Sequence, residues 1–347
     1  MTQTLELIIN TDTLIRILGL GIFTFALSML ITPIYTTLAF NHQWWKKPRQ
    51  TTLTGEVAKV FTKLHAKKHE RHIPTMAGLI FVVSVAFITL TMNISRSETW
   101  LPLAAFVGAG LVGLIDDFIN IRGLGKGVAG LPSKLKLLLT TAVALVGGWY
   151  FFAKLDVTSI HVPSLGAWNI GWLVIPLFVF VVVATANAVN ITDGLDGLAG
   201  GLAAIAFGAY AVIAFIEARY GVAGFCLSVV GGLLSYTWFN VYPARFFMGD
   251  VGSFALGTAL GVVAMITDTV WLLPIIGIIF VAETGSVILQ TISKKLRHGK
   301  KIFRISPIHH HFEAIGWPET KVTMRFWILG QVAGVLGIAL FVIGRYV

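Results

Sequence analysis

The sequence NAVNITDGLDG, residues Asn187 to Gly197, follows a long apolar run and carries polar side chains at intervals of three. These side chains are Asn187, Asn190, Asp193 and Asp196. In a helix this spacing would place them near one stripe, and Gly194 would loosen the helix where it ends. Carboxylates and amides at the end of a membrane-length run are costly unless they pair, bind a cation or line a wet cavity. The stretch therefore predicts a membrane helix that ends at a ligand or cation site. The alternative is a polar helix end that reaches the lipid headgroups.

The composition is typical of a membrane protein. Of the 347 residues, 56% are hydrophobic and 12% are charged, whereas a soluble domain carries about 25% charged residues. We predict an all-α polytopic integral membrane protein in which residues 1–347 form one domain. Continuous apolar runs argue against an outer-membrane barrel. The single cysteine, Cys226, excludes an internal disulfide and a multi-cysteine zinc site. Glu6 and Asp12 favour a retained first span over a signal peptide.

Ten apolar runs are long enough to cross a bilayer, which takes about 20 helical residues. They lie at residues 14–40, 74–94, 101–118, 137–154, 171–190, 198–216, 221–241, 253–270, 271–292 and 326–344. The eighth and ninth runs almost touch, which predicts a very tight hairpin at residues 269–271. Residues 156–170 alternate in polarity and contain Pro163, Gly166 and Asn169, a pattern typical of a short hairpin or an amphipathic cover.

The basic residues predict how the chain is oriented. With ten spans, both termini lie on one side of the membrane, and the loops after odd-numbered spans lie on the other. Those loops, chiefly residues 41–73, 119–136, 242–252 and 293–325, hold 21 of the 26 Lys and Arg residues. The positive-inside rule makes this side cytoplasmic and both termini external. Anionic headgroups and anionic substrates, rather than nucleic acid, therefore account for the net charge of +10.

Two groups of carboxylates fall on the predicted cytoplasmic side. Asp116 and Asp117 end the third run, and Asp250 follows the seventh run between Gly249 and Gly252. Adjacent carboxylates suit cation binding or acid–base chemistry, because like charges push their pKa values apart. Taken singly, the pair is also compatible with a solvated helix end, and the Asp250 segment with an ordinary turn.

A histidine triplet, His309 to His311, follows the basic segment 294–304 on the same side. Consecutive helical residues do not face one another, and no cysteine is near to complete a tetrahedral set, which argues against zinc. We expect the histidines to donate hydrogen bonds to phosphate or to act as acid–base groups. A surface cluster without a role is the alternative.

Together these residues predict a cytoplasmic pocket for phosphoryl chemistry with a hard divalent cation, Mg²⁺ above all. Its acidic and amide members are Asp116, Asp117, Asn190, Asp193, Asp196 and Asp250. No P-loop or dinucleotide fingerprint supports ATP as an energy source. A transporter is a competing class, but the interiors of the runs are bare of charge apart from Glu283. A structural scaffold protein is a further alternative, but it would not need six acidic and amide side chains in one pocket.

Several segments resemble the polyprenyl-phosphate N-acetylhexosamine-1-phosphate transferases. They are PTMAG at Pro74–Gly78, DDF at Asp116–Phe118, NAVNITDGLDGLAGG from Asn187, FFMGDVGS from Phe246, AETGSVILQ at Ala282–Gln290 and PIHHHFEAIGWPETKVTMRFW from Pro307. The resemblance extends from about Pro74 to Arg325. Within the family, HHHFE followed by GWPETKV is similar to the branch that acts on a muramoyl-pentapeptide. A sister enzyme that transfers N-acetylglucosamine 1-phosphate is the alternative.

The resemblance implies a reaction at the bacterial cytoplasmic membrane. UDP-N-acetylmuramoyl-pentapeptide and undecaprenyl phosphate would give lipid I and UMP in peptidoglycan synthesis, with Mg²⁺ as cofactor. It also implies ten spans, a cytoplasmic active site and a possible homodimer. Direct attack by the lipid phosphate is our expectation, because proximity and electrostatics contribute much of such catalysis. A covalent phospho-sugar intermediate on an aspartate is the alternative.

The resemblance also implies a role for each matching residue. Asp250 would bind the metal, and Asp116 and Asp117 would act at the lipid phosphate. Asn190, Asp193 and Asp196 would line the nucleotide site, Phe247 would stack on uracil and Gln290 would help to read its edge. Asn240 and Lys136 match a pocket residue and a lysine of the family, and His309, His310 and His311 would contact substrate. The chain departs from the family at Ala77, at Thr140 and at Glu70, which stands in place of a lysine.

Overall fold

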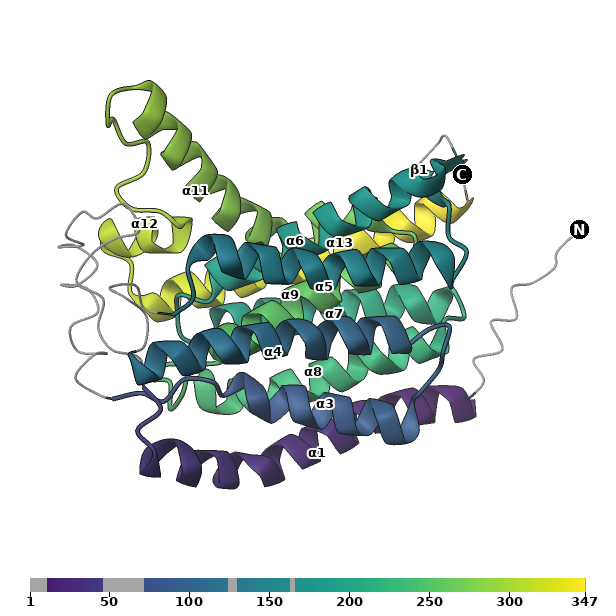
Figure 1. Cartoon of the computed structure of the whole chain (residues 1–347), viewed down its shortest axis with the longest axis horizontal. Coiled ribbons are helices and arrows are strands. Elements are labelled where there is room, and N and C mark those ends of the chain that lie inside the picture. The colour runs from purple at the N-terminus through teal and green to yellow at the C-terminus, as the bar shows by residue number, and fades with distance from the viewer. Residues whose placement is uncertain (1–10, 46–71, 124–129, 163–165, 347) are drawn as a thin grey trace, which may run out of the picture.

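The computed structural model describes residues 11–45, 72–123, 130–162 and 166–346. Most of its helices run along one common axis and form a bundle (Figure 1). They are α1 Thr11–Asn41, α3 Gly78–Met92, α4 Trp100–Arg122, α5 Ser133–Ala153, α6 Val174–Thr192, α7 Leu198–Ile216, α8 Tyr220–Asn240, α9 Gly249–Ile266, α10 Leu273–Ile276, α11 Ile278–Leu296, α12 Ile308–Ala314 and α13 Glu319–Tyr346, with short 3₁₀ turns η1 Gly171–Leu173 and η2 Val270–Leu272. The predicted helical architecture is confirmed.

Within the described residues, eight helices are long and apolar enough to cross a membrane. A further span results if η2 with α10 and the following α11 are counted together, and α3 is a shorter apolar helix of 15 residues. The chain is thus a multi-pass membrane protein. The total of ten spans and their orientation remain predictions.

The ninth apolar run is not one straight helix. The tight connection predicted before it is present, at residues 267–269, but η2 and α10 then meet α11 at an angle of 81°. Pro274 lies in the first turn of α10, and Gly277 lies at the bend. Proline cannot continue the hydrogen bonds of a preceding helix, and a Cβ on Gly277 would lie only 2.9 Å from the carbonyl oxygen of Leu273. As a result α11 leans out of the bundle (Figure 1).

The two ends of the bundle differ. Strands β1 Ser159–Val162 and β2 Gly166–Asn169 pair antiparallel, which confirms the hairpin predicted for residues 156–170. This hairpin lies beside the end of α13, at the end of the bundle where α1 begins, and α12 lies at the opposite end (Figure 1). We call these the hairpin end and the α12 end.

Helix α9 forms the centre of the bundle, because the whole of its apolar stretch is buried. Small residues let its neighbours approach closely. A Cβ on Gly113 of α4 would overlap the carbonyl of Asp250, and a Cβ on Gly257 would overlap the backbone of α6 at Ala186. Close backbone contact through small residues is typical of membrane helices. It fixes the start of α9 against the end of α4.

Candidate active site

Three carboxylates converge where the end of α4 meets the start of α9, at the α12 end. They belong to Asp116, Asp117 and Asp250, and each offers an oxygen that lies within 4.8 Å of the others. Asp116 and Asp117 are buried, and the side chain of Asp250 is 14% exposed. The structure therefore unites two motifs that are more than 130 residues apart in the sequence. We call this group the acidic cluster.

Lys136 of α5 lies within the acidic cluster. Its Nζ donates to Asp116 Oδ2 at 3.0 Å and also to Asp250 Oδ2. The backbone N–H of Leu131 donates to the other oxygen of Asp116 at 2.6 Å, and that of Val251 donates to Asp117 Oδ2 at 3.2 Å. Among the described residues, three carboxylates thus lie around one ammonium, and a group so rich in carboxylate oxygens suits a divalent cation.

Glycines bring the backbone close to these carboxylates. A Cβ on Gly130 would overlap the carboxylate of Asp116, and a Cβ on Gly249 would overlap that of Asp117. Both glycines have positive φ, +95° and +71°, which a residue with a side chain rarely adopts. The donor set and the confined space fit Mg²⁺, a small cation that prefers carboxylate oxygens and keeps positions for substrate oxygens.

The four polar residues of the opening stretch do not form one helical stripe. Helix α6 ends at Thr192, and Asp193 has non-helical dihedral angles (φ −76°, ψ 60°). Asn190 remains on the helix, and its Nδ2 donates to Ser253 Oγ at 2.8 Å, on α9 close to Asp250. Asn187 instead donates to the carbonyl of Val183 one turn back. The single stripe required a continuous helix, and α6 instead ends before the two aspartates, next to Gly194, where the sequence predicted that the helix would loosen.

Asp196 and Asn240 join the segment after α6 to two other segments. Asp196 Oδ2 accepts from the backbone N–H of Ala244 at 2.9 Å, while its own N–H donates to Glu319 Oε1 at 2.6 Å. Asn240 accepts from the N–H of Gly197 at 2.9 Å and donates to the carbonyl of Phe246 at 2.8 Å. Both side chains are buried. They hold the loop that leads to Asp250.

Phe247 and Gln290 are also held by backbone contacts. The N–H of Phe247 donates to the carbonyl of Pro74 at 2.8 Å, and its carbonyl accepts from Ala77 at 3.0 Å. Gln290 donates to the carbonyl of Phe303, and its oxygen accepts from the N–H groups of Ile302 and Phe303. The Gln290 amide therefore orders the loop after α11 in this structure.

The three histidines lie in α12 and have three different partners. His309 Nδ1 lies 2.9 Å from Glu283 Oε2, and His310 Nδ1 lies 2.7 Å from Glu313 Oε2. His311 Nδ1 accepts from the backbone N–H of Arg304 at 3.1 Å. Among the described residues, the potential metal-ligand group contains aspartates and none of these histidines.

Comparison with known proteins gives the family. Residues 99–268 match the model of glycosyl transferase family 4, a range that includes all three members of the acidic cluster. The chain is 40% identical over 322 residues to a phospho-N-acetylmuramoyl-pentapeptide-transferase of Geobacillus sp. (strain WCH70), covering 91% of this chain and 95% of the relative. It is 42% identical to the protein of that name in Bacillus velezensis, with the same coverage, and 38% identical to the one in Thermodesulfovibrio yellowstonii, covering 92% and 94%.

The chain belongs to the phospho-N-acetylmuramoyl-pentapeptide transferase family. The resemblance noted in its motifs is therefore confirmed along nearly the whole length of these relatives. The muramoyl branch is favoured over the N-acetylglucosamine branch. Glu70, the main departure from the family pattern, lies outside the described residues.

The sequence did not identify several partners of the predicted site residues. Ser253, Glu313 and Glu319 each form a hydrogen bond with a predicted site residue or its backbone. Periodicity could not reveal these contacts, because most join segments that are distant in sequence. Glu283 did carry a signal, as a charge in the interior of an apolar run, far from either end.

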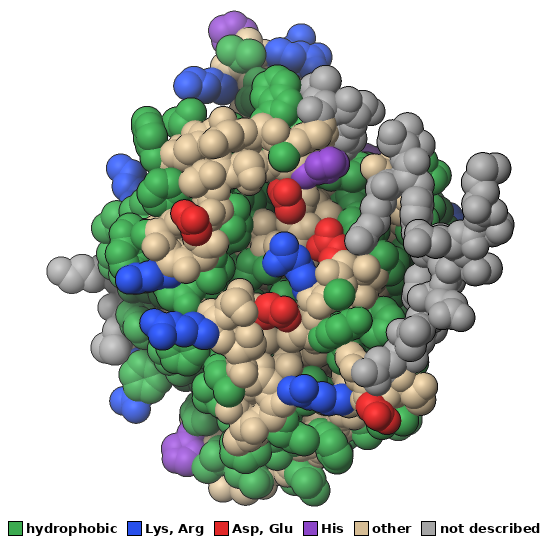
Figure 2. Space-filling model, turned by 90° about the vertical axis from the view of Figure 1, so that its right-hand side faces the viewer, with side chains coloured by type: hydrophobic (Ala, Val, Ile, Leu, Met, Phe, Trp, Pro, Cys, Tyr) green, Lys and Arg blue, Asp and Glu red, His purple; other side chains and the backbone are tan. Residues whose placement is uncertain are grey.

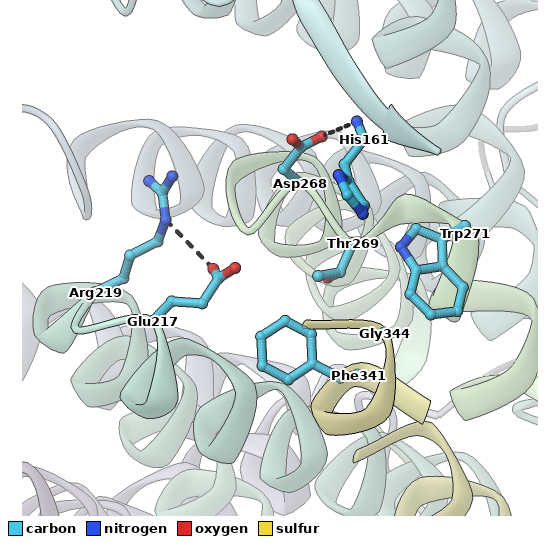
Figure 3. Close-up of a pocket in the computed structure, with 8 residues that line it drawn as sticks. All are labelled: His161, Glu217, Arg219, Asp268, Thr269, Trp271, Phe341 and Gly344. Carbon is cyan, nitrogen blue, oxygen red and sulfur yellow. Dashed lines mark hydrogen bonds and ion pairs between the residues drawn. The ribbon is translucent and has the colours of Figure 1, made fainter. Parts of the chain in front are cut away.

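A separate group of charges lies on the hairpin end of the transferase, where acidic and basic side chains mix on the surface (Figure 2). A pocket of about 390 Å³ there is lined by Glu217, Arg219, Asp268 and His161, with Trp271 and Phe341 among its apolar members. Arg219 Nε pairs with Glu217 Oε2 at 3.4 Å, and Asp268 accepts from the backbone N–H of His161 at 2.9 Å (Figure 3). Arg219 and Glu217 therefore offset each other's charge, and Asp268 is held by a neutral backbone group. No predicted site residue lines the pocket.

Proposed function

We propose that this chain transfers phospho-N-acetylmuramoyl-pentapeptide from its UDP conjugate to undecaprenyl phosphate, giving lipid I and UMP. The acidic cluster with Lys136 is the observation that carries the proposal. It concentrates three carboxylates and one ammonium at one end of a membrane bundle. Family membership supplies the muramoyl donor, because the relatives carry that substrate in their name.

Asp250 would hold Mg²⁺, with Asp116 and Asp117 as adjacent carboxylates. The bound ion would neutralise charge on the pyrophosphate oxygens and so favour departure of UMP. The side chain of Lys136 is 20% exposed, and in the proposed reaction it would exchange its carboxylate contacts for phosphate oxygens. Its ammonium would then offset the charge of two anionic substrates.

The remaining predicted residues would bind and orient the substrates. Phe247 would stack on uracil, and Asn190 and Asp193 would line the nucleotide site. His309, His310 and His311 would approach the phosphates from α12. Asp196, Asn240 and Gln290 form hydrogen bonds to backbone groups of the surrounding loops. We therefore assign these three residues a supporting role, ahead of direct contact with substrate.

We favour a single displacement. An oxygen of the lipid phosphate would attack the phosphorus attached to the sugar, and the bond from that phosphorus to the bridging oxygen would break. The bridging oxygen would leave with UMP. The lipid phosphate is already anionic, so positioning and charge neutralisation supply most of what the reaction needs.

The membrane arrangement follows from the same proposal. The α12 end would face the cytoplasm, where the UDP conjugate is available, and the hairpin end would face outward. The cytoplasmic membrane of a bacterium is the proposed location. A homodimer remains part of the proposal, and nucleic acid has no place in it.

Release of UMP by the purified protein in detergent tests the proposal. We expect UMP only when UDP-N-acetylmuramoyl-pentapeptide, undecaprenyl phosphate and Mg²⁺ are all present, and none after addition of EDTA. UMP from UDP-N-acetylglucosamine instead would assign the chain to the sister activity. No UMP from either donor, with the protein shown to be folded, would refute transfer altogether.

A further inference from the structure

Glu283 of α11 and His309 of α12 form a buried pair between two helices. The Glu283 side chain is 0% exposed and that of His309 is 1% exposed. His309 Nδ1 lies 2.9 Å from Glu283 Oε2, and the backbone N–H of His309 points to the same oxygen at 3.4 Å. One carboxylate oxygen thus contacts both the ring and the backbone of the histidine.

This contact determines which ring nitrogen carries a proton. An ionised carboxylate only accepts hydrogen bonds, so the nitrogen that faces it must be a donor. We propose that Glu283 is a positioning residue for the transfer reaction: it accepts a hydrogen bond from the Nδ1–H of His309 and so directs Nε2 toward the substrate. Nε2 donates to a phosphate oxygen once it also carries a proton, and the carboxylate of Glu283 offsets the charge of the ring in that state. The inference rests on the function proposed above and adds a residue to it.

The position of Nε2 supports this role. Nε2 is buried and has no hydrogen-bond partner among the described residues. It lies against Gly194, where an added Cβ would overlap it. Buried ring nitrogens are normally satisfied, so an exception suggests that a partner arrives with the ligand. Gly194 belongs to the segment that contains Asp193 and Asp196.

Glu283 also differs from the acid that contacts the neighbouring histidine. Glu313 and His310 are three residues apart on one short helix and form a local pair. Glu283 and His309 are 26 residues apart and join two elements. A carboxylate inside an apolar membrane segment is expensive, and such residues usually serve a function. If the Glu283–His309 contact served only to join α11 to α12, two apolar side chains could do so without the free-energy cost of burying a carboxylate.

The tautomer of His309 can be measured without any activity. In protein labelled with ¹⁵N-histidine, the His309 ring signals are those lost in His309→Asn. We expect a protonated Nδ1 in the parent, and protonation of Nε2 as well when UDP-N-acetylmuramoyl-pentapeptide is added with Mg²⁺. Glu313→Gln is the matched control and should alter the His310 signals while leaving those of His309 in place. A neutral ring protonated at Nε2 in the parent would overturn the proposal.

Kinetics provide the second test. Glu283→Gln keeps the size of the side chain and removes its charge, and we expect kcat for UMP release to fall about 100-fold, as misplaced catalytic groups do. The KM for the nucleotide substrate should stay close to that of the parent. Thr291→Ala changes an exposed hydroxyl of α11 that bonds only within its own helix, and should leave both constants unchanged.

The possible outcomes separate this inference from the proposed function. An unchanged kcat in folded Glu283→Gln would overturn the role of Glu283 while leaving the transferase intact. If the parent itself releases no UMP, the function fails, and the role of Glu283 in that reaction fails with it. If Glu283→Gln does not fold, the tautomer of the parent and the response of Nε2 to substrate decide the question.

Discussion

Lys136 is the residue that compensates the acidic cluster when no cation is bound. It contacts Asp116 and Asp250 at once, and its side chain is only 20% exposed. Buried carboxylates are tolerated when a nearby positive charge offsets the cost of removing them from water. A bound divalent cation could take over this task and release Lys136 toward substrate phosphates.

Replacing Lys136 by methionine tests this exchange. Removal of one partner from a buried ion pair costs about 3–5 kcal/mol, so Lys136→Met should lower the Tm measured in EDTA. Mg²⁺ should restore part of the loss, because the cation can offset the remaining carboxylates. The control is Lys134→Met, at an exposed position of the same helix. Equal Tm values for the two variants in EDTA would contradict the role of Lys136.

At this scale the sequence predicts residue types better than contacts. The carboxylates at 116, 117 and 250 were recognisable because they end or interrupt apolar runs. The pairing of Glu283 with His309 was not, since helical periodicity carries no information about which distant segments meet. The stripe through Asp193 applied only to a continuous helix, and α6 ends one residue earlier. The glycines predicted that the helix would loosen here, but local spacing does not determine at which residue it ends.

At the scale of elements, the close approach of α4 and α9 positions the acidic cluster. Gly113 of α4 faces the carbonyl of Asp250 without room for a Cβ. The two aspartates of α4 therefore lie beside the first turn of α9. Any side chain at residue 113 would separate the two helices and with them the carboxylates.

Two alanine substitutions on α4 test this dependence. Gly113→Ala should lower the Tm and abolish most UMP release, because the added methyl overlaps backbone that cannot move aside. Gly108→Ala on the same helix would meet only the side chain of Val143 at 3.4 Å. It has the same effect on helix propensity and should be tolerated. Similar activity for the two variants would show that the close approach is not required.

The hairpin end has its own interaction between elements. Asp268, in the turn after α9, accepts a hydrogen bond from the backbone of His161 in β1. Burial raises the pKa of the Asp268 carboxyl above its usual 3.8, and the bond from His161 partly opposes this. Since the folded pKa is the higher one, the folded state loses stability as pH rises through it.

Asp268→Asn should remove this loss. Asparagine keeps an oxygen acceptor for His161 and carries no charge, so the Tm at pH 7 should equal or exceed that of the parent. The advantage should shrink as the pH falls toward 3.8, the unfolded value. Asp156→Asn, at an exposed position beside the hairpin, is the control and should not show this dependence. A Tm that falls by the same amount at every pH would contradict the account.

At the scale of the whole molecule, the predicted site residues gather at the end opposite the hairpin. The apolar runs and the basic loops predicted a multi-pass bundle and this separation of its two ends. They did not predict the 81° bend between α10 and α11. A hydropathy profile is the same for a straight and a bent apolar run. Pro274 and Gly277 indicate that the helix is interrupted, but they do not give the angle between the two parts.

Cysteine labelling tests the orientation of the bundle. The single cysteine, Cys226, is buried and can be removed by Cys226→Ala. In that background Trp168→Cys, at an exposed position of the hairpin, should react with a membrane-impermeant maleimide in spheroplasts. Lys300→Cys, exposed after α11, should react only after the membrane is opened. The reverse pattern would invert the proposed topology.

Binding of Mn²⁺ in place of Mg²⁺, followed by electron paramagnetic resonance, tests the central claim most directly. The claim is that the acidic cluster holds the divalent cation used in transfer. With UDP-N-acetylmuramoyl-pentapeptide present, the parent should bind one ion, and Asp250→Asn should bind it at least about tenfold more weakly while remaining folded. Equal affinity in the two proteins would place the cation elsewhere and contradict the account.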